Sequence, residues 1–241
     1  MTQAERNTAG SKQARPQGAP LAVIEEWLAP LAGRRLLDVG CGRGALARRL
    51  VARKAQVVGV DPQPQTIAAA RELVPEAEFR ETGAQALPFA DSAFDAAVLL
   101  NSFHHVPLSL MDAALGEVLR VCAGPVLVIE PLAEGPFFEV MRPVEDETEQ
   151  RLAAQAAITR TVEAGVARLL RAHDFDDVRS FADVDAFLAK VIAADPARAE
   201  TAARLRGEVE ALMRQWGTPE GEGLRLDQPH RALLLQKADH L

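Results

Sequence analysis

The stretch LLDVGCGRGAL, residues 36–46, places an apolar strand directly before three glycines and the start of a helix. Asp38 stands within the apolar residues, and Gly40, Gly42 and Gly44 follow at alternate positions. Glycine tolerates positive φ and lets a ligand approach the main chain, while a helix N-terminus offers unpaired amides to polar groups. This stretch therefore predicts a ligand-binding turn at the carboxyl end of a core strand, as in doubly wound α/β proteins.

Outward from this turn, strand and helix periods alternate along the chain. A short amphipathic helix is expected from residue 20, with strands at 35–39, 55–60, 77–80, 95–100 and 125–130 and helices at 45–53, 66–73 and 108–121. Continuous apolar strands that alternate with helices indicate a sheet buried on both faces. We therefore predict an α/β, doubly wound, mostly parallel sheet with helices on both faces.

The regular alternation of strand and helix patterns ends after residue 130. We expect a long connection, a helix reaching about residue 173, a strand at 178–181, helical stretches between 183 and 216, and a last strand at 231–236. The helical stretches carry two apolar stripes, which either pack on the edge of the sheet, close over a pocket as a lid, or join two subunits in a homodimer. We assign residues 1–19 to a flexible tail and 20–241 to a single domain, with 183–217 as a helical lid or insertion.

Composition excludes several classes of protein. The chain has 241 residues, and 27 basic against 34 acidic residues give a formal net charge of −7. Without a basic run, a nucleic-acid partner is not expected, because phosphate contacts dominate such affinity. No apolar run reaches the ~20 residues of a membrane span, and residues 1–19 lack the apolar core of a signal peptide. Cys41 and Cys122 lack metal-ligand spacing and the density of a disulfide scaffold, so we expect no metal and a cytoplasmic location.

The glycine spacing fits two ligand templates. Gly40, Gly42 and Ala45 match the dinucleotide fingerprint G-x-G-x-x-G/A, with Asp61 near the distance of the ribose-binding acid, which would indicate a nicotinamide-dependent oxidoreductase. Asp38 with the three glycines matches D-x-G-x-G-x-G. The chain contains no tyrosine and offers no convincing Tyr/Lys or Ser catalytic pair. The second template is therefore favoured.

That second template resembles the glycine-rich signature of class I S-adenosylmethionine-dependent methyltransferases. LLDVGCGRG (36–44), VVGVDPQ (57–63) and AQALPFADSAFDAAVLLNSFHHV (84–106) occur in the order and at the intervals of that family. The last block is similar to the branch that includes quinone-biosynthesis C-methyltransferases. The resemblance covers residues 21–131 and implies a Rossmann-like methyltransferase fold, S-adenosyl-L-methionine as cofactor, and methyl transfer to a small-molecule acceptor by in-line displacement.

The resemblance also assigns cofactor-binding positions. It places the methionine part against the glycine turn, the ribose hydroxyls on a carboxylate after the second strand, and the adenine beside the residues that follow; the positions are Asp38, Gly40, Cys41, Gly42, Gly44, Asp61, Pro62, Gly83, Ala84 and Asn101. Many relatives carry an aspartate where this chain reads Thr-Gly-Ala-Gln at 82–85, so we expect the Ala84 backbone or the Gln85 side chain to replace it. The missing carboxylate motivates an alternative, a non-catalytic protein that binds S-adenosylmethionine or S-adenosylhomocysteine.

The acceptor is expected beyond the fourth core strand. His105 is the candidate catalytic base, since a histidine near neutral pKa can remove a proton, although orientation alone can supply much of the acceleration. We expect His104, Glu130, Phe137 and Arg142 to contribute to substrate binding, although Glu130 at the end of the fifth strand can equally bond to loop amides. The segment 137–149 is either a solvated loop leading into a helix or a substrate gate in which Arg142 takes a carboxylate or the acidic residues take an amine.

Overall fold

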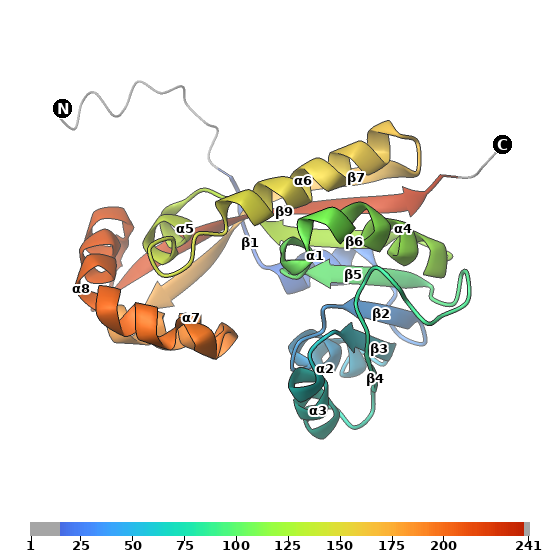
Figure 1. The fold of residues 1–241 in the computed structure, drawn as a ribbon, viewed down its shortest axis with the longest axis horizontal. Coiled ribbons are helices and arrows are strands. Elements are labelled where there is room, and N and C mark those ends of the chain that lie inside the picture. Colours follow the sequence, from blue (N-terminus) through green and yellow to red (C-terminus); the bar gives the residue numbers. More distant parts are fainter. Residues whose placement is uncertain (1–14, 239–241) are drawn as a thin grey trace.

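A mixed sheet forms the centre of the computed structural model, which describes residues 15–238 (Figure 1). Within these residues the strand order is β1-β7-β9-β6-β5-β2-β3-β4, and β8 pairs with β9. The strands are β1 (Gln17–Gly18), β2 (Arg35–Val39), β3 (Gln56–Asp61), β4 (Glu78–Glu81), β5 (Ala96–Leu100), β6 (Val126–Pro131), β7 (Ala167–Phe181), β8 (Thr218–Glu220) and β9 (Gly223–Lys237). From β6 to β4 all neighbours are parallel, whereas β9 runs antiparallel to both β6 and β7.

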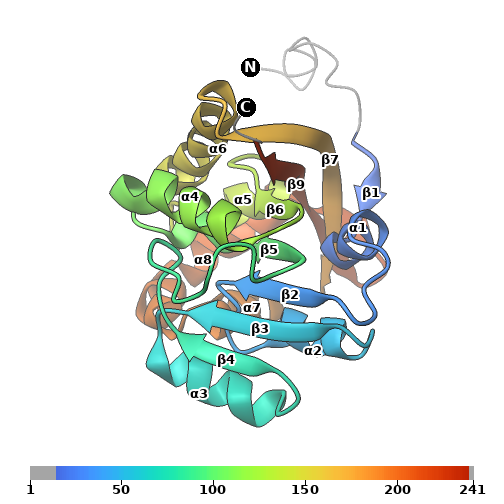
Figure 2. The ribbon, with the colours of Figure 1, turned by 90° about the vertical axis from the view of Figure 1, so that its right-hand side faces the viewer.

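Helices cover both faces of this sheet. The α-helices are α1 (Pro20–Trp27), α2 (Ala45–Val51), α3 (Pro64–Leu73), α4 (Met111–Val121), α5 (Pro136–Met141), α6 (Thr148–Glu163), α7 (Val184–Ala194) and α8 (Ala199–Trp216), with short 3₁₀ turns η2 (Phe103–His105), η3 (Leu108–Leu110) and η4 (Pro196–Arg198). Figure 2 shows α1 and α4 on opposite sides of the strands. The predicted doubly wound, mostly parallel fold is confirmed.

Alternation of side chains along the strands produces two apolar cores. Leu37 and Val39 of β2 pack with α4 and α6, whereas Leu36 packs with α1, α2 and α3 on the other face. All three side chains are buried. Because successive residues of a strand point to opposite faces, a continuous apolar run is what a strand covered on both sides requires.

The C-terminal half differs from expectation in its strands. The helix expected to reach about residue 173 ends at Glu163, and β7 occupies Ala167–Phe181. β7 pairs with β9 along its whole length, from Ala167 opposite Lys237 to Phe181 opposite Leu224. Residues 168–173 are exposed. Their sequence therefore lacks the alternation of apolar and polar residues that predicts a half-buried strand. Pairing with a distant segment decides their conformation.

The start of the described chain also differs from the expected tail. Gln17 and Gly18 form β1 and pair in parallel with Asp176 and Asp177 of β7, and Arg15 forms an ion pair with Glu134. The remainder of the expected tail, residues 1–14, lies outside the described residues.

The helices expected between 183 and 216 are present as α7 and α8. They lie with α5 at one end of the molecule, beside the ends of β7 and β9 (Figure 1). Their apolar side chains form a third cluster with those elements, which includes Phe137, Phe138, Phe181, Phe187, Val209, Met213 and Leu226. Trp216 at the end of α8 remains 41% exposed. Among residues 15–238, no helix combines the length and the apolar character that crossing a membrane requires.

Candidate functional site

The turn between β2 and α2 depends on left-handed backbone conformations. Gly40, Gly42 and Gly44 have φ values of 72°, 52° and 82°. A Cβ atom at Gly40 would lie 2.4 Å from the Cβ of Ser102, so the close approach of the loop after β5 excludes any side chain there. A Cβ atom at Gly42 would meet no described atom within 4 Å. Gly42 therefore presents bare backbone to open space, where a ligand can approach.

Asp38 lies beside this turn and carries an unsatisfied carboxylate oxygen. The residue is 2% exposed, and its Oδ2 has no hydrogen-bond partner among the described residues. Burial raises the pKa of Asp38 to about 7, against a smaller opposing effect of the Ala47 backbone amide. Buried polar atoms are almost always paired in folded proteins. The arrangement suits a cationic hydrogen-bond donor that arrives with a ligand.

Asp61 connects the end of β3 to the glycine turn. Its Oδ2 accepts a hydrogen bond from the Gly42 amide at 3.1 Å, and its Oδ1 accepts one from the Gln63 amide at 3.0 Å. An ionised carboxylate offers about four acceptor positions, so each oxygen can accept one further donor. Pro62 and Gln63 follow on the exposed surface.

The segment at 82–85 is shaped by its glutamine. A Cβ atom at Gly83 would lie 2.4 Å from Oε1 of Gln85, so the Gln85 side chain folds directly over Gly83. The Ala84 side chain is buried in the core cluster under α4. The Gln85 amide is thus one polar group of this segment, and the choice between it and the Ala84 backbone stays a prediction.

Asn101 directly follows β5 and has a left-handed backbone conformation with a φ of 51°. Nε2 of His230 lies 3.0 Å from its Oδ1, and Nδ1 of the same ring lies 3.0 Å from the Gln228 carbonyl oxygen. Desolvation lowers the pKa of the buried His230 to about 4, so this ring is neutral. His230 is missing from the predicted site. The predicted last strand begins at residue 231 and leaves His230 outside it, whereas β9 begins at Gly223.

The Glu130 carboxylate accepts hydrogen bonds from backbone amides at the start of the turn η2. Its Oε1 accepts hydrogen bonds from the Ser102 and Phe103 amides at 2.9 Å each, and its Oε2 accepts one from the His104 amide at 3.2 Å and pairs with His104 Nδ1. Burial disfavours the charged form of both His104 and Glu130. The attraction and the hydrogen bond between the two side chains outweigh this effect, so the pKa of His104 is raised and that of Glu130 is lowered.

These contacts favour the loop-amide alternative for Glu130 and give His104 a protein partner where a substrate contact is expected. Glu130 and His104 are 1% and 3% exposed, and Glu130 bonds to loop amides and to His104 rather than reaching a cleft. The pair holds the loop after β5 in place.

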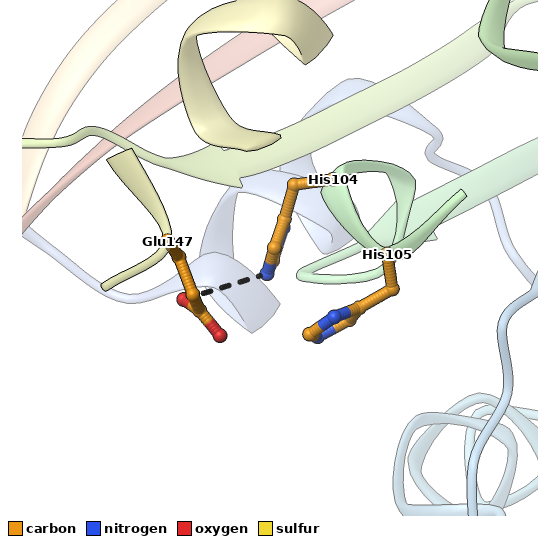
Figure 3. A group of neighbouring side chains, drawn as sticks. All are labelled: His104, His105 and Glu147. Atoms are coloured by element: carbon orange, nitrogen blue, oxygen red, sulfur yellow. Dashed lines mark ion pairs between the residues drawn. The ribbon is translucent and has the colours of Figure 1, made fainter. Parts of the chain in front are cut away.

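His105 and Glu147 complete a cluster around His104 (Figure 3). The exposed His105 ring contacts the His104 ring with centroids 4.0 Å apart, and Glu147 Oε2 lies 3.9 Å from His104 Nε2. Partial desolvation and the charge of His104 lower the pKa of His105, which favours its neutral form. Three possible metal ligands thus lie close together, although the sequence analysis predicts no metal. The group cannot be recognised from spacing in the sequence, because Glu147 lies 42 positions after His105 in an acidic run.

Phe137 and Arg142 are placed away from their expected roles. Phe137 packs in the C-terminal cluster, with ring centroids 5.4 Å from Phe187 and 6.2 Å from Phe181. Arg142 pairs with Glu139 at 3.0 Å on the surface. Both side chains already have protein partners, so the structure does not group them with the histidine cluster.

Comparisons with known proteins agree with the geometry of the turn. Residues 36–124 match the model of a methyltransferase domain family. The chain is 36% identical over 109 residues to an uncharacterized methyltransferase of Mycobacterium tuberculosis, covering 45% of this chain and 44% of that protein. It is 40% identical over 121 residues to the demethylmenaquinone methyltransferase of Thermus thermophilus, covering 46% and 54%. The chain thus spans about half the length of these curated relatives.

Solved structures extend the likeness in fold across most of the chain. The YcgJ protein of Bacillus subtilis has a TM-score of 0.64 at 18% identity, covering 91% of this chain and 98% of its own. A putative methyltransferase of Bacillus halodurans gives 0.64 at 19% identity, covering 92% and 100%. The [4+2]-cyclase SpnF gives 0.58 at 25% identity, covering 91% and 79%. The first two show the shared fold.

Proposed function

We propose that the chain transfers a methyl group from S-adenosylmethionine to a small-molecule acceptor, which the match of residues 36–124 to a methyltransferase domain family supports. One observation carries the proposal: Asp38, two residues before the glycine turn, has a buried Oδ2 without a hydrogen-bond partner among residues 15–238, and the backbone of Gly42 in that turn faces open space. A ligand that brings both a cationic donor and a polar backbone partner would satisfy this pair of features. The methionine part of the proposed cofactor has such an ammonium group.

The other residues of the turn fit the same ligand. The Asp61 carboxylate, already fixed by the Gly42 and Gln63 amides, keeps acceptor capacity for two vicinal ribose hydroxyls. Pro62 and the Gln85 amide would lie beside the adenine, where many relatives use a carboxylate. When bound, the cofactor supplies a methyl group activated by a sulfonium. The chain's own part is to hold the ligand in place and to exclude water from the reacting groups.

His105 is proposed to act on the acceptor. It follows the carboxyl end of β5, where ligands of doubly wound sheets bind, and its neutral form can accept a proton from a hydroxyl or amine. The Glu130–His104 pair is proposed to position this ring through the contact between the two imidazoles. A cytoplasmic location and a homodimer stay predictions of the sequence.

A second candidate is a protein that binds the cofactor without transferring its methyl group. Two observations favour it: the adenine carboxylate of many relatives is replaced by the segment 82–85, and SpnF, whose fold matches 91% of this chain, is named a [4+2]-cyclase rather than a methyltransferase. The nicotinamide alternative has no comparable support.

Transfer of labelled methyl groups separates the two candidates. The protein is incubated with S-adenosylmethionine labelled in the methyl group and a panel of acceptors, beginning with quinone precursors because two relatives are named for menaquinone and ubiquinone biosynthesis. Labelling of an acceptor by the protein, and its loss in Asp61→Ala, would support methyl transfer. Saturable cofactor binding without labelling of any acceptor in a broad metabolite extract would favour the second candidate, and no binding at all would contradict both.

A further inference from the structure

Three side chains from two separate segments converge after β5, outside the glycine turn. His104 and His105 belong to η2, and Glu147 directly precedes α6 (Figure 3). One nitrogen or oxygen atom from each residue lies within 4.8 Å of those of the other two. We propose that His104, His105 and Glu147 bind a divalent transition-metal ion of the zinc class. The proposal concerns cation binding and does not depend on the outcome for methyl transfer.

The separations fit one shared ion. Zinc lies about 2.0–2.2 Å from imidazole nitrogen and carboxylate oxygen, so two ligand atoms of a tetrahedral site lie about 3.4 Å apart. The 3.9 Å between His104 Nε2 and Glu147 Oε2 is about 0.5 Å longer than this separation. The 4.8 Å bound on the whole group then requires an inward movement of at most about 1.4 Å. His105 can supply it by side-chain rotation, because its ring is exposed.

Glu130 prepares His104 for this role. The ionised Glu130 carboxylate is an acceptor only, so the Nδ1 that pairs with it must carry a proton and donate. The remaining ring nitrogen, Nε2, then faces Glu147. Metal-binding histidines usually donate their second nitrogen to a carboxylate or carbonyl in this way, which fixes the tautomer and the ring orientation. His104 therefore has the second partner that a metal-binding histidine requires.

Glu147 is held in place while keeping one acceptor position. Its Oε2 accepts from Arg151 Nε at 3.0 Å and Nη2 at 2.7 Å, and its Oε1 accepts from Arg198 Nη2 at 3.2 Å. Two of these bonds occupy Oε2 and one occupies Oε1, so the free lone-pair position of the carboxylate is on Oε1. An ion bound through Oε2, the oxygen that lies 3.9 Å from His104 Nε2, would therefore replace one of the two Arg151 bonds. Because both arginines are fixed, the carboxylate needs little ordering when an ion binds.

The surrounding charges also favour a cation. Arg151 and Arg198 supply two positive charges, while Glu130, Glu147 and Glu145, the second partner of Arg198, supply three negative charges. With both histidines neutral, the cluster therefore carries one net negative charge. The two positive charges of a divalent ion on the three ligands would leave the cluster with one net positive charge.

The ligand set indicates the class of ion and its chemistry. Two imidazoles and one carboxylate suit zinc and neighbouring late transition metals, whereas magnesium and calcium prefer oxygen ligands throughout. Three protein ligands leave a fourth position open, as in catalytic zinc sites. Since His105 is exposed, that position faces solvent and can take an oxygen or nitrogen atom of a ligand. With the ion bound, the lone-pair nitrogen of His105 is a ligand and no longer accepts a proton. A hydroxyl bound to the ion would instead release its proton to solvent more easily.

The test is calorimetric titration of the untagged, chelator-treated full chain with ZnCl₂. We expect one site per chain, with affinity at least 10-fold weaker in His105→Ala, whose exposed side chain can be removed without disturbing the core. Glu147→Gln should weaken binding similarly, with its fold checked by circular dichroism. His173→Ala is the matched control, because His173 is an exposed histidine on β7 outside the cluster, and it should bind zinc like the unmodified chain.

Substitution with cobalt adds a spectroscopic measurement. Co²⁺ bound to imidazole and carboxylate should give visible absorption bands without the thiolate charge-transfer band expected if Cys41 or Cys122 were a ligand. The proposal is overturned if zinc does not bind below about 100 µM, a Kd corresponding to roughly −5.5 kcal/mol. It is equally overturned if His105→Ala binds zinc as tightly as the unmodified chain, or if the cobalt spectrum shows thiolate ligation.

Discussion

Cofactor binding should depend on pH through Asp38. Burial raises the pKa of this carboxyl to about 7 in the ligand-free protein. Such a group is ionised in about one molecule in eleven at pH 6 and in about half at pH 7. A ligand ammonium that pairs only with the ionised carboxylate, and keeps it ionised once bound, should therefore bind about fivefold more tightly at pH 7 than at pH 6. That ratio corresponds to about 1 kcal/mol of binding free energy.

The measurement is calorimetric titration with S-adenosylhomocysteine at pH 6.0, 6.5 and 7.0. This range stays below the ordinary pKa of an α-amino group, about 8, so the ligand keeps its charge. Repeating the titration at pH 7 in buffers of different ionisation enthalpy should reveal release of about half a proton per site, since half of the Asp38 carboxyls must ionise.

Asp38→Asn provides the control, because it keeps the size of the side chain and removes its titration. This variant should bind more weakly and lose the pH dependence. If the unmodified protein shows the same affinity at pH 6 and pH 7 and releases no proton, Asp38 is not the partner of the ligand ammonium. The interpretation of its unpartnered oxygen would then be wrong.

Three further results are expected. Without ligand, Asp38→Asn should raise the free energy of unfolding by up to about 4 kcal/mol at pH 8. The reason is that an acid whose folded-state pKa is raised to about 7 loses stability as pH rises from its unfolded-state pKa of about 4 to that value; equal melting temperatures would contradict this. Gly42→Ala should weaken cofactor binding by about 10-fold or more by filling the open side of the turn, a loss of about 1.4 kcal/mol. Gly33→Ala, at the other end of β2, shares the positive φ and the open surroundings and should leave the affinity unchanged; equal losses in both variants would indicate backbone strain alone. Trp216→Ser, at the 41% exposed end of α8, tests whether this helix belongs to a lid, one of the three alternatives that the sequence leaves open for residues 183–217. It should reduce acceptor turnover more than cofactor affinity, and a folded variant with unmodified turnover would make α8 ordinary packing.

The parallel half of the sheet was predictable because its strands are apolar on both faces and follow one another with regular helices between them. Asp38 and Asp61 could be placed at the carboxyl ends of neighbouring strands for the same reason, since Asp38 is next to the last residue of β2 and Asp61 is the last residue of β3. Their contacts could be predicted only in part. That Asp38 Oδ2 stays unpartnered among the described residues is a property of the packing around it.

The remaining features depend on contacts between distant segments. The first half of β7 is exposed, and its pairing with β9, more than 50 positions later, makes it a strand. Glu147 reaches the histidines because Arg151 and Arg198, from α6 and η4, hold its carboxylate. From the sequence alone, Phe137 could either line a pocket or pack in a hydrophobic core. In the structure it packs against α7 in the C-terminal cluster.

The position of β9 has a consequence for how the chain folds during synthesis. β9 lies between β6 and β7 in the sheet although both precede it in the chain. The segment from β2 to β6 can pair locally as it leaves the ribosome, but β6 keeps an unpaired, apolar edge until residues 223–237 have been made. Unpaired strand edges promote association between chains. The nascent protein is therefore most prone to aggregation during the interval in which some ninety residues after β6 are translated, and shortening that interval by faster translation should improve the yield of folded protein.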